Sequence, residues 1–389
     1  MKITLSSFAE NSRDARELST ASKAGWDYLH VIAPLGFSDL HSKPVWSCTE
    51  IDLRPFGNKG IKKIFGNIVA FFRFIKYARK KQPRVISGHD LLGLLIGYLA
   101  TLGRRKKCVL IYDAHEYEMG RFVGDERNIL HKKAISIIER FLIKKCVFSI
   151  IVNNSIAKQM EKDYKLNFPK VIARNIPIQR SLDLELTKAV RRNWIKKLNI
   201  SEDSMIMMYH GGLQAKRGIE TSIEICSRIT DIGLVILGNG SPEYISELKS
   251  LVNSKGICDR VLFNEAVPGS ILTSYIAASD FGLILIKPVS LNHKFSLPNK
   301  LFENIHAGKP VVASHLPELA KVVEKYNIGL LCDPNDIDDV ETKVRKMLRS
   351  SLRTELTKNV LSAREKLTWE NEEKELQSKL LSIYDDMNN

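Results

Sequence analysis

The sequence lacks any apolar run long enough to cross a membrane, because a spanning helix needs about 20 consecutive apolar residues. The most apolar stretch, residues 91–102, is shorter than this and predicts a buried helix instead. The six cysteines are scattered and form no CxxC pair, so we expect reduced thiols rather than a disulfide framework or a zinc site. No short-period repeat and no low-complexity tract is present. What remains is a globular chain of 389 residues, long enough for about two domains.

Acidic residues are scarce in the first half of the chain. Residues 1–175 contain 31 Lys and Arg against 16 Asp and Glu, whereas the remainder contains 28 of each. The whole formal net charge of +15 therefore belongs to the first half. This asymmetry predicts a surface for an anionic partner, namely nucleic acid, membrane phospholipid or a phosphorylated acceptor; the alternative is a basic face without a partner.

Short β-like runs alternate with helical patterns through both halves. Strands are predicted at residues 2–7, 28–34, 84–90, 107–115, 148–154, 170–177, 205–212, 233–240, 260–268, 281–286 and 310–314. Helices are predicted at residues 15–25, 60–81, 91–103, 131–145, 218–229, 241–256, 271–280 and 368–389. Such alternation implies right-handed crossovers and an α/β fold with parallel sheets covered on both faces. The join between two doubly wound domains is expected within residues 175–199, which are charged and carry little β pattern.

Residues 296–314 carry the most informative pattern. A turn at residues 298–300 opens into a helix, and the unpaired N–H groups and dipole of a helix N-terminus suit a diphosphate. Glu303 lies one turn into this helix, close enough to accept hydrogen bonds from the hydroxyls of a sugar. Gly308 and Pro310 end the helix before a buried strand. The spacing predicts a nucleotide-sugar site.

Glycine-rich turns follow two of the predicted strands of the second half. Gly211 and Gly212 allow the backbone to approach a phosphate closely, and the basic pair Lys216–Arg217 can neutralise a diphosphate. The alternative for the basic pair is a solvated loop. The second turn consists of Gly238, Asn239 and Gly240, for which contact with a nucleotide and a simple strand-to-helix turn are both open.

Histidines end two predicted strands of the first half. His115 lies between Asp113 and Glu116, and His89 precedes Asp90. A lone histidine is usually structural, but parallel strands place their carboxyl ends at the ligand-binding edge of a sheet. We therefore expect these side chains to face a ligand.

Five segments together resemble a retaining glycosyltransferase of the GT-B fold, family 4 (group 1), and the resemblance covers nearly the whole chain. They are YDAHE at 112–116, HGGLQAKRGIE at 210–220, LGNGSPE at 237–243, PNKLFENIHAGKPVVAS at 298–314 and TWENE at 368–372. The resemblance implies two Rossmann-like domains facing across a cleft: an acceptor-binding domain at 1–180 and a nucleotide-sugar-binding domain at 181–365. A C-terminal helix at 366–389 would cross back onto the first domain.

The resemblance also implies a role for each candidate residue. The residues implied to be catalytic are His115, Glu303, Lys216 and Arg217. Those implied to bind the donor are Gly211, Gly212, Gly238, Asn239, Gly240, Ala266, Val267, Phe295, Pro298, Asn299, Lys300 and Leu301. Those implied to bind the acceptor are His89, Asp90 and Ser7. No metal and no cofactor are expected, and a UDP-sugar is favoured over a GDP-sugar as the donor.

Three positions depart from the family pattern. The family often has two glutamates eight positions apart; Glu303 occupies the second position, but the first is Phe295, with His293 or Lys294 as substitutes for the missing carboxylate. The basic residue usual after the loop glycine is replaced by Gly212 or Leu213. The first strand runs into SSFAENSRD instead of a Gly-Gly loop. These departures leave a sugar-nucleotide epimerase or an inactive relative as the alternative function.

The predicted helix at residues 60–81 concerns the acceptor. Its apolar residues share one face and are Ile61, Ile64, Phe65, Ile68, Phe72 and Ile75, with Lys and Arg on the remainder. Such a helix can lie on an anionic membrane, and core packing of the apolar face is the alternative. With the charge asymmetry, it favours a lipid-linked or polysaccharide acceptor at the inner face of a bacterial cytoplasmic membrane. A nucleic-acid-binding protein is the less favoured explanation, because it leaves the glycine loops unexplained.

Overall fold

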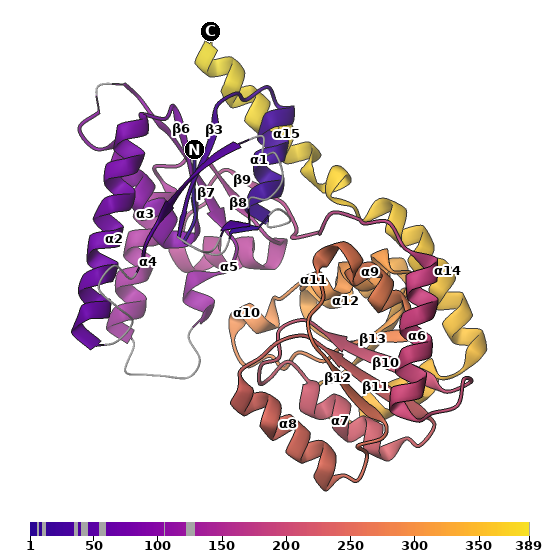
Figure 1. Ribbon diagram of the computed structural model, residues 1–389. Helices are drawn as coiled ribbons and strands as arrows, with labels where there is room; N and C mark the ends of the chain where they lie inside the picture. Colours follow the sequence, from indigo (N-terminus) through magenta and orange to yellow (C-terminus); the bar gives the residue numbers. More distant parts are fainter. Residues whose placement is uncertain are drawn as a thin grey trace. The chain divides into compact units, whose positions relative to one another are not determined.

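The computed structural model describes residues 1–5, 8–9, 13–34, 38–39, 46–53, 60–104, 106–121 and 129–388. The chain divides into two compact units: the first is Met1–Asn175 with Glu370–Asn389, and the second is Ile176–Trp369. Figure 1 shows a sheet with helices on both of its faces in each unit. The predicted α/β class with two doubly wound parallel sheets is confirmed.

The first unit is built on a seven-stranded parallel sheet within its described residues, in the order β5-β3-β1-β6-β7-β8-β9. These strands are β1 (Lys2–Ile3), β3 (Leu29–Pro34), β5 (Trp46–Ile51), β6 (Val85–His89), β7 (Val109–Ala114), β8 (Phe148–Ile151) and β9 (Lys170–Ile172). A separate parallel pair is formed by β2 (Phe8–Ala9) and β4 (Ser38–Asp39). Strand order reverses at β1, so β1 and β6 flank the point where ligands bind in open α/β sheets.

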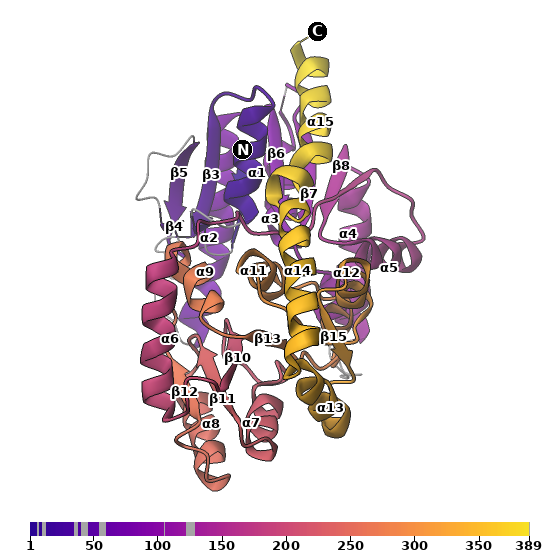
Figure 2. The same cartoon turned by 90° about the vertical axis from the view of Figure 1, so that its right-hand side faces the viewer.

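Helices cover both faces of the first sheet. They are α1 (Arg13–Lys23), α2 (Gly60–Lys81), α3 (Asp90–Thr101), α4 (Ile129–Ile143), α5 (Asn154–Tyr164) and α15 (Trp369–Asn388), with a 3-10 turn at Glu118–Arg121. The apolar helix predicted at 91–103 is α3, which packs on β6 and β7 with Leu94 and Ile96 fully buried. Figures 1 and 2 show α1 and α15 side by side on one face. Glu373 of α15 joins them, since it pairs with Lys23 and accepts a hydrogen bond from Thr20.

The second unit is built on a six-stranded parallel sheet within the described residues, in the order β12-β11-β10-β13-β14-β15. Its strands are β10 (Met205–His210), β11 (Ile232–Leu237), β12 (Val261–Asn264), β13 (Phe281–Ile284), β14 (Val311–Ser314) and β15 (Gly329–Cys332). β10 lies centrally between β11 and β13, and it is the strand at which the chain order reverses. The loop that leaves β10 therefore lies at the switch point of this sheet.

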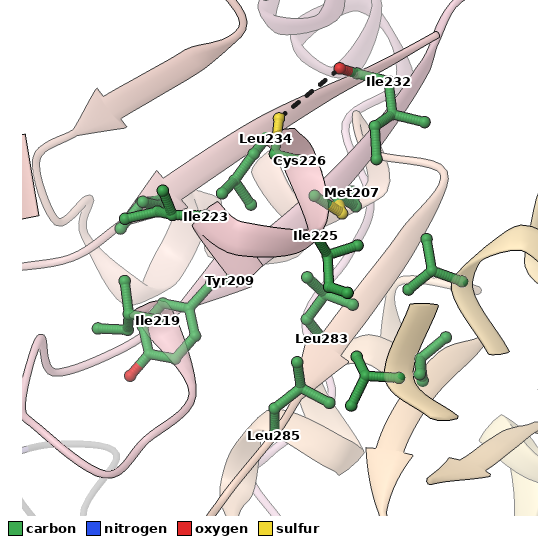
Figure 3. Packing of buried hydrophobic residues seen from close by; sticks show 14 of the residues in the cluster. Met207, Tyr209, Ile219, Ile223, Ile225, Cys226, Ile232, Leu234, Leu283 and Leu285 are labelled. Carbon is green, nitrogen blue, oxygen red and sulfur yellow. Dashed lines mark hydrogen bonds between the residues drawn. The ribbon is translucent and has the colours of Figure 1, made fainter. Parts of the chain in front are cut away.

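Helices also cover both faces of the second sheet. They are α6 (Leu184–Leu198), α7 (Ile219–Arg228), α8 (Pro242–Ser254), α9 (Gly269–Ala277), α10 (Leu291–Lys294), α11 (Asn299–His306), α12 (Pro317–Tyr326), α13 (Ile337–Met347) and α14 (Ser350–Lys366). In Figure 3, Ile219, Ile223 and Ile225 of α7 pack with Met207 and Leu234 of the strands. All five are fully buried, so the core rigidly supports the loops at the ends of β10 and β11.

Several elements differ from those expected. The edge strands β5 and β15 were not predicted, and α6 occupies most of the region expected to be a join, with Trp194 fully buried in the second unit. Core packing of the apolar face, the alternative interpretation of α2, is wrong for the first five apolar residues of this helix. Ile61 is 85% exposed and Phe72 63% exposed, whereas Ile75 is buried as core packing requires. Within the described residues, none of the helices has both the length and the apolar character that spanning a membrane requires.

Candidate functional site

Three loops at the carboxyl edge of the second sheet are joined by backbone hydrogen bonds. Gly211 N–H donates to Leu237 O (2.9 Å), and Leu213 N–H donates to Asn239 O (2.8 Å), so the pairing of β10 with β11 continues into the two glycine turns. The Asn239 side chain accepts a hydrogen bond from Ala266 N–H (3.1 Å), which connects the loop after β12. The structure thus brings together the residues predicted at 211–212, 238–240 and 266–267.

The glycine at 238 is required by the contact between these loops. Gly238 has φ +153°, and a Cβ there would lie 2.0 Å from Gly211 O. Gly212 differs, because it is exposed and nothing lies within 4 Å of the position of its Cβ. The simple-turn interpretation therefore explains Gly238, but it does not explain Gly212. The backbone at Gly212 remains open to a ligand.

The helix predicted after the turn at residues 298–300 is α11. No side chain caps its N-terminus at Pro298. Leu301 and Phe302 are fully buried in the core of the unit, which fixes the helix on the sheet. Glu303 lies one turn into α11, as expected, and its Oε2 lies 3.0 Å from His210 Nε2. Because His210 ends β10 and is buried, this hydrogen bond links Glu303 to the glycine loop.

The basic residues of this edge occupy different environments. Lys216 is exposed and has φ +68°, while Arg217 is half-buried and donates from Nε to Gln214 Oε1 (3.1 Å). Lys300 is buried, and its ammonium lies 3.5 Å from the centre of the Tyr209 ring. Burial and the neighbouring Arg217 hold the pKa of Lys300 well below its usual range. The buried cation of this edge is thus Lys300, which the resemblance implied to bind the donor.

Phe295 follows the short helix α10, which was not predicted. Its N–H donates to Leu291 O (2.9 Å), and it caps the C-terminus of α10. Of the two proposed substitutes for the missing carboxylate, His293 is held by Ser290, and Lys294 is exposed. Position 295 therefore carries no carboxylate, and neither His293 nor Lys294 supplies one.

In the first unit, the predicted histidines meet at the carboxyl ends of β6 and β7. The rings of His89 and His115 lie against each other, with their centres 3.7 Å apart and their planes tilted by 37°. His115 Nε2 lies 2.8 Å from Asp113 Oδ2, and His89 Nδ1 lies 3.0 Å from both carboxylate oxygens of Asp14. Burial lowers the pKa of His89, but its hydrogen bond and ion pair with Asp14 raise it by more, so the net shift is upward.

A buried cation that the sequence analysis missed holds this cluster together. Lys2 of β1 is 1% exposed, and its ammonium contacts Asp113, Glu17 at 2.6 Å and Asp14 at 3.0 Å. Arg13 adds a second buried cation, paired with Glu17 at 2.8 Å. The sequence could have indicated this charge network. A lysine inside a parallel strand that is buried on both faces needs a charged partner, because lysine is almost never fully buried unless it is paired.

The same cluster could hold a metal ion by residue type. One ligand atom from each of Asp14, His89, Asp113 and His115 lies within 4.8 Å of the others. The Lys2 ammonium, however, already pairs with the carboxylates of Asp14 and Asp113, so the donor set does not fit an additional cation.

The acidic run at residues 336–339 of the second unit caps the helix α13. Asp336 accepts hydrogen bonds from the N–H groups of Asp338 and Asp339.

The predicted residues thus form two groups, one in each unit. The donor-binding candidates and Lys216, Arg217 and Glu303 lie in the second unit, and His89, Asp90 and His115 lie in the first. Asp90 has φ +53°, and its side chain accepts a hydrogen bond from His115 N–H (3.0 Å). Ser7, the remaining acceptor-binding candidate, lies outside the described residues.

Comparison with known proteins supports a glycosyltransferase that uses a nucleotide-sugar donor. Residues 190–363 match the family model of glycosyl transferases group 1. An uncharacterized glycosyltransferase of Methanocaldococcus jannaschii is 24% identical over 297 residues, which are 75% of this chain and 73% of the relative.

Two solved structures show the same fold at low sequence identity. Sucrose-phosphate synthase from Thermosynechococcus elongatus superposes with a TM-score of 0.76 at 17% identity, over 99% of this chain and 98% of that one. Anabaena HepE, solved in complex with UDP and glucose, superposes with a TM-score of 0.70 at 15% identity, over 98% of this chain and 100% of that one. The chain therefore has the GT-B fold of glycosyltransferases, and its second unit carries the part that matches the group 1 model.

Proposed function

We propose that this protein is a retaining glycosyltransferase that moves a sugar from a nucleotide diphosphate to an acceptor. The observation that carries the proposal is the carboxyl edge of the second sheet. There the open backbone at Gly212, the uncapped start of α11 and Lys300 beside Gly211 provide positive potential. The likeness to HepE, which was solved with UDP, favours a UDP-sugar as the donor.

The reaction requires stabilisation of a leaving diphosphate and of an oxocarbenium-like sugar. Positive groups already in position when charge develops supply the largest contribution to such catalysis. Arg217, Lys300 and the N-terminus of α11 provide that potential. Glu303 is proposed to hold the ribose hydroxyls, and its orientation is set by His210. His115 is proposed to orient the transferred sugar, held by Asp113.

Retention is proposed to occur by attack from the face that the diphosphate leaves. The bond between the anomeric carbon and the diphosphate oxygen breaks, and a bond from the acceptor oxygen forms on the same face. The proton of the acceptor hydroxyl passes to the departing phosphate oxygen, so neither an enzyme nucleophile nor a metal is part of the proposal. The anomeric configuration of the product, read from its NMR coupling constants, tests this step; a product with inverted configuration would rule it out.

The donor is tested by thermal shift against UDP-, GDP-, ADP- and CMP-sugars. Stabilisation by one donor is expected in the wild type and is expected to be lost in Glu303→Ala. The matched control is Glu247→Ala on the exposed surface of α8, which should keep the shift. A wild type that responds to none of the donors would contradict the proposal. Donor binding without transfer would instead favour the second candidate, an epimerase or inactive relative, to which Phe295 points.

The acceptor is proposed to be lipid-linked or a polysaccharide at an anionic membrane surface, where the protein would bind peripherally from the cytoplasmic side. The support is α2, which exposes Ile61, Ile64, Phe65, Ile68 and Phe72. The same helix carries seven Lys and Arg and no Asp or Glu. Exposed apolar side chains among cations suit insertion into the interface of an anionic bilayer.

Sedimentation with liposomes tests the membrane proposal. Binding to vesicles that contain phosphatidylglycerol is expected, with little binding to pure phosphatidylcholine. The double variant Ile64→Ser/Ile68→Ser should lose most of this binding, and Leu361→Ser, an exposed apolar residue of α14, should not. Binding that does not depend on anionic lipid would count against the proposal.

A further inference from the structure

Lys300 has an unusual environment for a lysine. Its side chain is 7% exposed, and its ammonium lies 3.5 Å from the centre of the Tyr209 ring. A Cβ at Gly211 would lie 2.9 Å from Lys300 Cε and 3.6 Å from Nζ. The absence of a side chain at Gly211 therefore leaves room for the lysine, whose ammonium lies directly beside the backbone of the glycine loop.

This ammonium has no anionic partner. Within the described residues, no carboxylate forms an ion pair with Lys300, and its ammonium faces the ring of Tyr209. The charged groups that act on it are Arg217 from the glycine loop and Glu303 from its own helix, and Glu303 is already bound to His210. A buried cation without a counter-ion is unfavourable, which is why burial and Arg217 depress its pKa.

The other lysine that is buried among the described residues, Lys2, does not share this property. Lys2 is buried to the same degree, yet its ammonium contacts three carboxylates. Lys216, next to Arg217, is exposed and therefore screened by water. Of the two lysines buried among the described residues, Lys300 is thus the one without a carboxylate bound to its ammonium, at the edge where the proposed donor would bring an anion.

We propose that the diphosphate of the donor is the missing counter-ion of Lys300, so that Lys300, assisted by Arg217, is its principal cationic ligand. Lys216 then contributes only a screened, long-range attraction. The inference rests on the proposed function and adds to it the residue that holds the leaving group. The phosphate oxygens would accept a charge-assisted hydrogen bond from the Lys300 ammonium, which has no carboxylate bound to it among the described residues.

The test is isothermal titration of the whole protein with UDP, GDP and ADP. The diphosphate that binds the wild type most tightly is then titrated into variants, together with its nucleoside. Lys300→Met is expected to weaken diphosphate binding 10- to 100-fold, with less than 3-fold change for the nucleoside. Lys216→Met should weaken it less. Lys325→Met, which removes an exposed lysine beside a tyrosine ring on α12, should leave it unchanged.

Diphosphate binding by Lys300→Met within 3-fold of the wild type would overturn the inference alone. An equal loss for diphosphate and nucleoside would also overturn it, because it indicates damage to the site. Failure of the wild type to bind any diphosphate would overturn the proposed function as well.

Discussion

The carboxyl edges of the two sheets solve the problem of buried charge in opposite ways. In the first unit, the edge is filled by charged side chains that neutralise one another: Lys2 and Arg13 pair with Asp14, Glu17 and Asp113. In the second unit, glycine turns form much of the edge, and among the described residues no carboxylate pairs with the buried Lys300. The sheets share their parallel architecture, so the difference comes from side chains alone.

The contrast indicates where an anionic ligand is needed. A network whose cations already touch carboxylates gains little from a phosphate, because the phosphate would displace existing pairs and meet like charge. An edge with open N–H groups and an unpaired amine gains a counter-ion. The first edge is therefore suited to hold two imidazoles in place, and the second to bind a diphosphate. Four substitutions test this difference between the two edges.

Lys2→Met should have the largest effect. It leaves three buried carboxylates without the ammonium that contacts them, and removing one partner of a buried ion pair destabilises a protein by about 3–5 kcal/mol. Thermal and urea unfolding, followed by circular dichroism, measures the change against Lys325→Met as the control. A loss below about 1 kcal/mol would show that the first edge is not held by its charges.

Glu139→Gln tests a buried carboxyl group of the first unit that does not belong to the network around Lys2. Glu139 of α4 is fully buried, accepts hydrogen bonds from Tyr112 and Tyr164, and has no cation among its hydrogen-bonding partners. Burial raises its pKa from 4.5 to about 7. The protonated form is favoured by folding, so its contribution to the free energy of unfolding is greatest below pH 4.5 and falls as the pH rises to 7.

Glu139→Gln should remove this pH dependence and stabilise the protein by up to about 3 kcal/mol above pH 7. The difference between wild type and variant in urea unfolding, measured from pH 4 to pH 8, isolates the contribution of this carboxyl group. A difference that stays constant over that range would contradict the assigned shift.

Gly238→Ala should lower the free energy of unfolding of the second unit by about 2 kcal/mol. The residue has φ +153°, and its new Cβ would lie 2.0 Å from Gly211 O. Gly212→Ala is the matched control and should change stability by less than about 0.5 kcal/mol, because its Cβ meets nothing within 4 Å. Equal effects of the two substitutions would mean that the loops do not need their close approach.

Lys300→Met should have the smallest effect on the protein without ligand, and in the opposite direction to Lys2→Met. Replacing an unpaired buried amine by an apolar side chain of similar length should raise the free energy of unfolding by about 1 kcal/mol. Thermal unfolding without nucleotide measures it. A clear destabilisation would indicate a structural role for the ammonium and would remove the contrast between the two edges.

The sequence predicted the central strands well and the edges poorly. β10, β11, β13 and β14 read as apolar runs because both of their faces are covered. β5 and β15 lie at the ends of their sheets and are only partly buried, so their composition is not distinctive. In α2 the amphipathic spacing was clear, but it could not tell whether another element covers the apolar face.

The sequence by itself determined the α/β architecture and the helix that carries Glu303, because these depend on local patterns of apolar residues, glycine and proline. It also identified the motifs of the proposed donor site, because each motif and their order along the chain can be read without the tertiary structure. Only the tertiary structure decided which charges are paired. Lys2 meets Asp113 across 111 positions, and Lys300 meets Tyr209 across 91. Pairing of buried charges depends on which strands become neighbours, and no local pattern encodes that.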